Sequence, residues 1–271
     1  MIRLLQLSDI PGAMRLKEAA GWNQTELDWT NLLATEPEGC FGIDCEGVLA
    51  ASTTAVCYGR SLAWIGMVLT APEFRGRGFA RRLMEHSLGF LAARGVEWIK
   101  LDATDMGLPL YAKLGFVEEC LVERWGRGPG PLPPGPALSW SDSFDAPLDL
   151  DAFGADRGAV LHRIAVESAW IPGCAYAMGR PGTKAAYFGP CVSRSPETAR
   201  VLLQSFLARH AGETVVWDLL PGNPEALRLA QEFGFERRRR LVRMALTGRP
   251  DPPPFLHNDA AVYGIAGFEY G

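Results

Sequence analysis

The stretch from Trp64 to Leu83, WIGMVLTAPEFRGRGFARRL, constrains the fold of this 271-residue chain more than any other. It begins as an apolar run, turns at Pro72, continues through a basic, glycine-rich segment and ends in apolar residues at helical spacing. This pattern predicts a strand, a glycine-rich loop and the start of a helix. Such a geometry directs several backbone N–H groups at one place, where the helix dipole and nearby arginines favour an anion. The stretch therefore predicts a pyrophosphate-binding loop, with glycines that let a phosphate approach the main chain.

Two other kinds of phosphate-binding loop do not fit these residues. A P-loop requires GxxxxGK[ST], but Gly78 is followed by Phe-Ala-Arg-Arg. A dinucleotide-binding fingerprint requires GxGxxG; Gly76 and Gly78 supply the first two glycines, but Arg81 stands in the third position. The loop belongs to a different class.

Composition excludes several partners. Apolar residues make up 48% of the chain and charged residues 21%, which is typical of soluble globular proteins. The net charge of −4 argues against nucleic acid as the main partner. No apolar run approaches the ~20 residues of a membrane span, and the first residues do not form a signal peptide. These features predict a cytoplasmic protein that binds neither nucleic acid nor membrane.

The six cysteines include no CxxC pair, and they do not cluster with the four histidines. We therefore expect buried, reduced thiols and no metal site.

The length suits two domains of moderate size, each able to bury a core. A segment of dense proline and glycine, GRGPGPLPPGP, begins at Gly126 and cannot hold a helix or a central strand. This predicts an N-terminal domain over residues 1–126, a linker over 127–139 and a C-terminal domain over 140–271.

Two motifs of the first half resemble the GNAT acetyltransferase superfamily. Arg75-x-x-Gly78-x-Ala80 is similar to the superfamily's acetyl-CoA signature R/Q-x-x-G-x-G/A, and residues 109–116, PLYAKLGF, are similar to its LYxKLGF segment. The expected element order also fits: a strand, two helices, a meander, then strand–helix–strand–helix–strand. The resemblance implies an α/β (α+β) fold with a mixed central sheet flanked by helices. It also implies an N-acetyltransferase, which is an acyltransferase, with acetyl-CoA as cosubstrate.

The second half repeats the first in degenerate form. Ala186–Gly189 corresponds to Ala63–Gly66, and Phe233-Gly234-Phe235 corresponds to the LGF of the second motif. Between these points the second half lacks the glycine-rich loop, and an alanine stands opposite Tyr111. The chain thus looks like a bacterial tandem-GNAT protein with a degenerate C-terminal domain. We expect one acetyl-CoA per chain.

The resemblance assigns roles to particular residues. Tyr111 would protonate the departing CoA sulfur; the alternatives are that it only orders the thioester or is a core residue. The strand before the loop would bind pantetheine through its backbone, with Val68 N–H as oxyanion donor. Thr104 stands where the superfamily usually has asparagine. The residues expected to bind the cofactor are Met67, Val68, Leu69, Arg75, Gly76, Arg77, Gly78, Phe79, Ala80 and Thr104.

The acceptor side is less defined by sequence. Trp22 and Asn23 are candidates for lining the acceptor pocket, and Trp22 fits a core position equally well. Candidates for a general base are Glu26, Asp28 and Asp102, each of which also fits a cap, a salt bridge or a solvated position.

The predicted function is acetyl transfer from acetyl-CoA to an amine of a small molecule or peptide by direct attack. The alternative is a non-catalytic CoA-binding regulatory or scaffold protein, and a carrier of longer acyl groups is a third possibility. Acceptor identity stays open, as does the choice between monomer and homodimer.

Overall fold

The computed structural model describes residues 1–131 and 135–271. Contacts divide the chain into two compact units, and each unit is built from separate stretches of sequence. Unit 1 comprises Met1–Glu118, Met244–Pro254 and Phe268–Gly271; unit 2 comprises Glu119–Arg243 and Phe255–Gly267.

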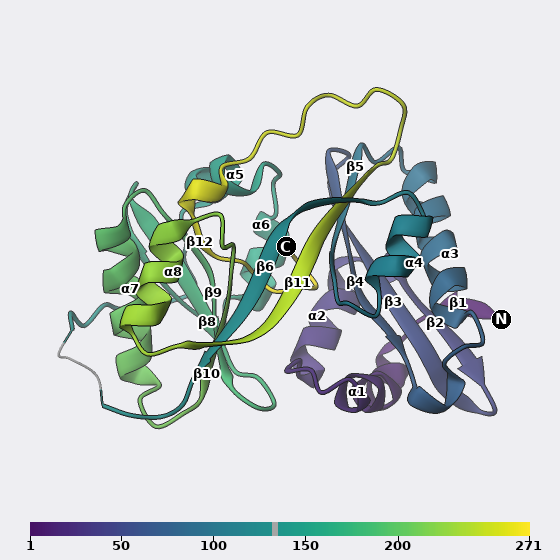
Figure 1. The fold of residues 1–271 in the computed structure, drawn as a ribbon, viewed down its shortest axis with the longest axis horizontal. Helices are drawn as coiled ribbons and strands as arrows, with labels where there is room; N and C mark the ends of the chain where they lie inside the picture. Colours follow the sequence, from purple (N-terminus) through teal and green to yellow (C-terminus); the bar gives the residue numbers. More distant parts are fainter. Residues whose placement is uncertain (132–134) are drawn as a thin grey trace. The chain divides into compact units, whose positions relative to one another are not determined.

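Unit 1 is a mixed sheet flanked by helices (Figure 1). Its strands run in the order β1-β2-β3-β4-β5, and residues 244–247 of β11 follow β5. From β1 to β4 neighbouring strands are antiparallel, whereas β4 and β5 are parallel. The strands are β1 (Ile2–Leu4), β2 (Cys40–Cys45), β3 (Val48–Tyr58), β4 (Leu62–Thr70) and β5 (Trp98–Ala103). The helices are α1 (Ile10–Ala19), α2 (Glu26–Thr35), α3 (Phe79–Ala93) and α4 (Leu108–Lys113), with 3-10 turns η1 (Leu7–Asp9), η2 (Pro37–Gly39) and η3 (Pro72–Phe74).

Local sequence explains the two helices that flank the candidate site. Helix α3 buries Leu83, Ser87 and Leu91, which recur at helical spacing, and it packs on β2, β3 and β4. Helix α2 begins at a capping box, in which Thr25 Oγ1 accepts from Asp28 N–H and the Asp28 carboxylate accepts from Thr25 N–H at 2.7 Å.

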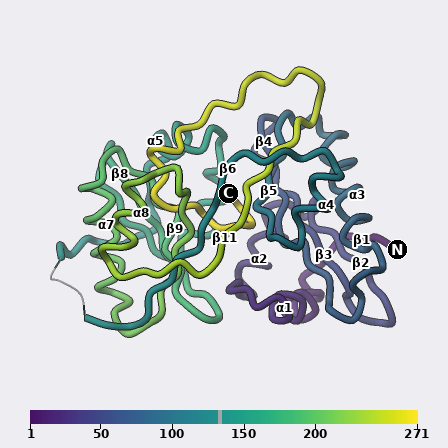
Figure 2. The backbone as a smooth tube through the Cα atoms, viewed as in Figure 1, coloured from purple at the N-terminus to yellow at the C-terminus, as the bar shows by residue number. Residues whose placement is uncertain are grey.

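The last four residues of the chain belong to unit 1, and their path is yellow in Figure 2. Trp64 Nε1 donates to the carbonyl of Phe268 at 3.0 Å, and the Tyr58 hydroxyl donates to the carbonyl of Tyr270 at 2.7 Å. Both donors come from the β3–β4 hairpin. The C-terminal segment is therefore an integral part of the unit 1 core.

The strands of unit 2 also pair in a mixed arrangement. Residues 236–243 of β11 are followed by β6-β10-β9-β8-β7, and β12 pairs with β9. Neighbours are antiparallel along β6-β10 and β9-β8-β7, and parallel between β10 and β9. The strands are β6 (Val117–Arg127), β7 (Glu167–Ile171), β8 (Ala175–Arg180), β9 (Ala186–Ser193), β10 (Val215–Leu219), β11 (Glu236–Thr247) and β12 (Val262–Gly264). The helices are α5 (Ala146–Phe153), α6 (Gly158–Ile164), α7 (Pro196–Arg209) and α8 (Pro224–Glu232), with the 3-10 turn η4 (Asp259–Ala261).

The sequence predicts that the strand near residue 126 ends the N-terminal domain. In the structure most of this strand, β6, belongs to unit 2. β6 runs antiparallel to β10 of unit 2, and a bidentate ion pair joins Arg124 to the buried Asp218 at 2.7 and 2.6 Å. The position beside β5 in unit 1 is filled by residues 244–247 instead. The two units are thus each built from separate stretches of the sequence. The domain boundaries at 1–126 and 140–271 stay a prediction. Of the linker expected at 127–139, residues 132–134 lie outside the described part of the chain.

The cysteines are less uniformly buried than expected. All six are free thiols, but only Cys40 and Cys191 are buried, and Cys174 is exposed. The expectation of six buried cysteines was wrong because Cys174 lies in the turn between β7 and β8, where its side chain meets solvent.

Unit 2 carries a pH-sensitive ion pair. His210 Nε2 lies 2.6 Å from Glu167 Oε1, and this hydrogen bond raises the pKa of His210 above its usual value. A raised folded-state pKa stabilises the protein fully below the unfolded pKa of about 6.5, and that stabilisation is lost as pH rises through the folded-state pKa. We expect His210→Gln to flatten this pH dependence in thermal unfolding measured from about pH 6 to pH 9. An unchanged dependence in the variant would assign it to other groups.

Candidate functional site

The loop between β4 and α3 has the backbone that the sequence predicts (Figure 1). Gly76 and Gly78 have φ angles of 75° and 76°, a region that side chains with a Cβ rarely adopt. A Cβ at either position would have no protein atom within 4 Å. The glycines are therefore required by the backbone conformation, and they leave open space in front of it.

Helix α3 starts directly from this loop. Its N-cap is Gly78, which makes no side-chain capping bond, and Phe79 and Ala80 are its first residues. Helix termini expose N–H groups that need an acceptor, and the helix dipole adds positive potential there. The N-terminus of α3 is therefore uncapped and suited to an anion.

Two arginines of the loop are held by neighbouring groups. Arg75 Nε donates to the carbonyl of Thr70 at 3.4 Å. Arg77 lies 5.0 Å from the ring centroid of the buried Phe74 and donates to Glu46 at 3.1 Å in an exposed ion pair. Exposed pairs of this kind contribute little and are readily exchanged for another anion. Both arginines are exposed beside the loop, and their role toward a phosphate stays a prediction.

Strand β4 contains a bulge next to the loop. Its pairing with β3 changes register between Ser52 and Thr54, whose partners are Leu69 and Gly66. Met67 takes a φ of 50°, and its carbonyl accepts from Ser52 Oγ at 2.9 Å. A non-glycine residue at positive φ stores strain, which often marks a functional backbone.

Strands β4 and β5 separate beyond this pairing. Their parallel register runs from Leu62 opposite Trp98 to Trp64 opposite Lys100, while β4 continues to Thr70. The edge of Met67–Leu69 that faces β5 therefore lies outside the described ladder with that strand. The expected binding of pantetheine by this part of the strand stays a prediction.

Tyr111 lies on α4 and is 7% exposed. Burial raises the pKa of its hydroxyl, so the phenol stays protonated throughout the physiological range. Its ring packs edge-on against Phe116 at a centroid distance of 6.2 Å. A Cβ on Gly107 would lie 2.7 Å from Tyr111 Cε2, so Gly107 makes room for the ring.

Thr104 orders the turn that leads into α4. Its hydroxyl accepts from Gly107 N–H at 3.3 Å, and its carbonyl accepts from the N–H groups of Gly107 and Leu108 at 2.9 Å. Thr104 therefore contributes to the placement of Tyr111, and its link to the cofactor remains a prediction.

The acceptor-side candidates are placed very differently. Asn23 is buried and Trp22 half-buried in the segment before α2, Glu26 is exposed in the first turn of α2, and Asp102 is half-buried near the end of β5. The Asp28 carboxylate is engaged in the capping box, which supports its reading as a cap. The role of these residues toward an acceptor stays a prediction.

A pair of buried polar residues in unit 1 was missed by sequence reasoning. Gln24 Nε2 donates to Glu269 Oε2 at 2.9 Å, and the side chains are 7% and 2% exposed. Glu269 also passes close to β4, because a Cβ on Gly66 would lie 2.8 Å from its Cα. The sequence segments GWNQ and GFEYG contain both residues, but no local pattern indicates that they meet.

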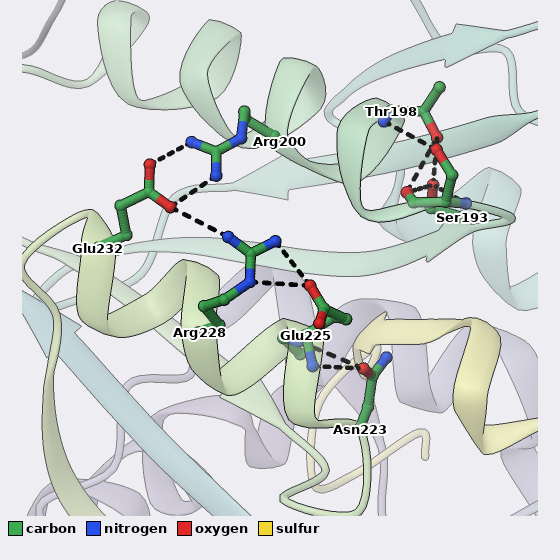
Figure 3. A network of polar contacts seen from close by, with 9 residues as sticks. Ser193, Thr198, Arg200, Asn223, Glu225, Arg228 and Glu232 are labelled. Atoms are coloured by element: carbon green, nitrogen blue, oxygen red, sulfur yellow. Dashed lines mark hydrogen bonds and ion pairs between the residues drawn. The ribbon is translucent and has the colours of Figure 1, made fainter.

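The counterpart of α3 in unit 2 has a side-chain cap at its N-terminus. Helix α7 begins at Pro196 and is capped by Ser195, whose Oγ accepts from Thr198 N–H at 3.3 Å. The Ser193 hydroxyl joins this cap, 2.5 Å from Thr198 Oγ1 (Figure 3). Here a side-chain oxygen accepts from one N–H group of the helix terminus, whereas α3 has no side-chain cap.

Charged side chains in the same region of unit 2 neutralise one another. Arg200 and Arg228 both contact Glu232, and Arg228 donates to Glu225 at 2.6 Å (Figure 3). Asn223 caps α8 by accepting from Glu225 and Ala226 N–H, and its amide donates to two carbonyls near β12. Asn223 therefore has a structural role in the second half.

Within residues 1–131 and 135–271, no three His, Cys, Asp or Glu side chains gather in a way that could hold a metal ion. Among the helices of these residues, none has the length and apolar character needed to cross a membrane.

Comparison with known proteins matches both halves of the chain to one superfamily. The model described as "Acetyltransferase (GNAT) family" matches residues 8–116, and that described as "Acetyltransferase (GNAT) domain" matches residues 146–263. An uncharacterized N-acetyltransferase, YitH of Bacillus subtilis (strain 168), is 24% identical over 228 residues, which cover 75% of this chain and 76% of that protein.

Solved structures show the same fold. A putative acetyltransferase from Pyrococcus horikoshii superposes with a TM-score of 0.87 at 21% identity, covering 100% of this chain and 95% of that one. A tandem GNAT protein from the clavulanic acid biosynthesis pathway superposes with a TM-score of 0.65 at 14% identity, covering 93% and 99%. These likenesses concern the fold alone.

Proposed function

Because the chain belongs to the GNAT superfamily and is accordingly an acyltransferase, we propose that unit 1 transfers an acetyl group from acetyl-CoA to an amine. The amine attacks the thioester directly while both substrates are bound. The family and the α/β fold confirm what the sequence predicts; the donor, the acceptor and the site residues belong to the proposal.

The open N-terminus of α3 carries this proposal. Gly76 and Gly78 hold the loop at positive φ, nothing in the protein fills the space before them, and Gly78 leaves the helix without a side-chain cap. Backbone N–H groups and the arginines Arg75 and Arg77 would together hold a pyrophosphate. Phe79 and Ala80 supply the first N–H groups of the helix.

The bulged strand would hold the acyl end of the cofactor. Met67–Leu69 lie beyond the described pairing of β4 with β5, and the register of β4 with β3 shifts around the strained Met67. We assign Val68 N–H as the donor to the thioester oxygen, where negative charge develops during attack.

Tyr111 would donate a hydrogen bond to the sulfur as it leaves. A free phenol titrates at about 10 and a thiol at about 8.5, and burial raises the pKa of Tyr111 further. Full transfer of the proton to a free thiolate is therefore uphill. A hydrogen bond that strengthens while the C–S bond breaks needs no such transfer, and it stabilises the transition state.

Unit 2 takes no acetyl-CoA in this proposal, because α7 is capped by Ser195 and its surrounding arginines are paired with glutamates. The proposed setting is a bacterial cytoplasm, to which the six free thiols are suited.

The proposal predicts one acetyl-CoA per chain in titration calorimetry and steady release of CoA with primary amines. Butylamine, spermidine and a tripeptide with a free N-terminus represent three acceptor classes, and the rate without amine is the control. Binding without amine-dependent release would instead support a non-catalytic CoA-binding protein, and two sites per chain would contradict the role given to unit 2.

A further inference from the structure

We propose that Ser52 is a positioning residue for acetyl transfer: its hydroxyl holds the peptide group between Met67 and Val68 in the orientation that lets Val68 N–H reach the thioester oxygen. This inference rests on the proposed function, which assigns Val68 N–H as the donor. It adds the side chain on which the direction of that donor depends. Ser52 acts through the backbone of β4 and contacts neither substrate.

Ser52 lies on β3 and holds the backbone of β4 from within the core. The residue is fully buried, and its hydroxyl donates to the Met67 carbonyl at 2.9 Å. In the pairing of the two strands, Met67 and Val68 fall between the paired positions Gly66 and Leu69, where the register shifts. The serine hydroxyl thus supplies a donor to the Met67 carbonyl at the place where the β3–β4 ladder is irregular.

The planarity of the peptide bond links this contact to Val68. The carbonyl of Met67 and the N–H of Val68 belong to one peptide group, which is trans, so they point in opposite directions. Because the carbonyl points to the hydroxyl of Ser52, the N–H points away from it. Strands β3 and β5 lie on opposite sides of β4 in the sheet. The contact therefore directs Val68 N–H away from the β3 side of the strand.

Two features of β4 indicate that this peptide group needs a restraint. Met67 has a φ of 50°, a conformation that costs energy for a residue with a Cβ and persists only where its surroundings hold it. The Ser52 hydroxyl opposes its relaxation by holding the carbonyl of the same residue. Val68 is half-buried, whereas its neighbours Met67 and Leu69 are buried. The strained residue and the more exposed one share the peptide group that Ser52 holds.

The direction of this N–H has its largest effect when the amine attacks. The thioester oxygen then gains negative charge, and a donor that is already in place stabilises this charge without reorganisation. In the proposed site the phosphates of the cofactor are held elsewhere, by the glycine-rich loop. A rotated peptide group at Val68 would therefore slow the transfer and leave most of the cofactor's binding contacts intact.

The test compares Ser52→Ala with wild type in two measurements. With whichever of butylamine, spermidine and the tripeptide wild type accepts, we expect kcat to fall about 30-fold, while the KM and dissociation constant of acetyl-CoA stay within about twofold. The infrared stretch of the thioester C=O in bound acetyl-CoA, isotope-labelled at the carbonyl, should move to higher frequency because its hydrogen bond is weaker. Ser52→Cys keeps a weak donor and should give intermediate values of both kcat and frequency.

Ser87→Ala is the matched control. Ser87 is also fully buried in unit 1, on α3, but its hydroxyl has no hydrogen-bond partner among the described residues. The substitution removes the same hydroxyl from a similar environment without removing a bond to the backbone of β4. Both kcat and the carbonyl frequency should equal those of wild type.

The role of Ser52 would be overturned if Ser52→Ala kept the wild-type kcat, if it kept the wild-type carbonyl frequency, or if it lost acetyl-CoA affinity in proportion to kcat. An equal loss of kcat in Ser87→Ala would also overturn it, by assigning the effect to a looser core. Failure of the proposed function gives a different result. In that case wild type itself would bind no acetyl-CoA or release no CoA with any of the three amines, and the role of Ser52 would fall with it.

Discussion

Replacing Gly78 by valine is expected to abolish acetyl-CoA binding. At a φ of 76° a β-branched residue is strained, and its side chain would enter the space that the loop leaves open. Relief of the strain would rotate the first N–H groups of α3 away from the pyrophosphate, and each charge-assisted hydrogen bond lost is worth about 1.5–3 kcal/mol. We expect the dissociation constant measured by calorimetry to rise at least ~1,000-fold, or about 4 kcal/mol.

Gly59→Val is a matched control for this experiment. Gly59 has a φ of 64°, a Cβ there would also meet no atom within 4 Å, and it lies in the turn between β3 and β4. Its substitution imposes similar backbone strain outside the glycine-rich loop. Normal affinity in Gly59→Val and lost affinity in Gly78→Val would separate the site from general stability. Normal affinity in both variants would remove the loop from the cofactor site.

The loop was accessible to sequence reasoning because its signals are local. A strand, a turn at Pro72, two glycines and an amphipathic helix follow one another within about twenty residues, and each is set by its own neighbours. The positive φ angles at Gly76 and Gly78 are what such a segment requires. The same holds for Tyr111, whose helix and adjoining Thr104 turn are formed within a few residues.

Contacts between distant parts of the sequence were not accessible in this way. Gln24 and Glu269 are 245 residues apart in sequence, and their hydrogen bond depends on the C-terminal segment returning to unit 1. Likewise, the pairing of β6 with β10 and the place of residues 244–247 beside β5 arise from non-local strand pairing. Periodicity identifies a strand but does not indicate its partner, so a boundary at residue 126 followed from composition alone.

The burial of Tyr111 narrows the role that we propose for its hydroxyl group. The sequence left open whether it protonates the sulfur or only orders the thioester. Because burial raises the pKa of the phenol, the group is a reliable hydrogen-bond donor and a poor acid. Its contribution should therefore be made in the transition state, where charge on sulfur is greatest, and little in the ground state.

Tyr111→Phe is accordingly expected to lower kcat about 100-fold while leaving acetyl-CoA affinity within twofold, since the ring still packs on Phe116 and only the hydroxyl is lost. Steady-state CoA release and calorimetry measure the two quantities. Tyr187→Phe is the control: it removes a buried hydroxyl of unit 2 that donates to the carbonyl of Ile265 at 2.9 Å. It should cost about 1 kcal/mol of stability and leave kcat unchanged. If Tyr111→Phe lost affinity and turnover in equal measure, the hydroxyl would be a ground-state contact, and stabilisation of the leaving sulfur would have to come from another donor.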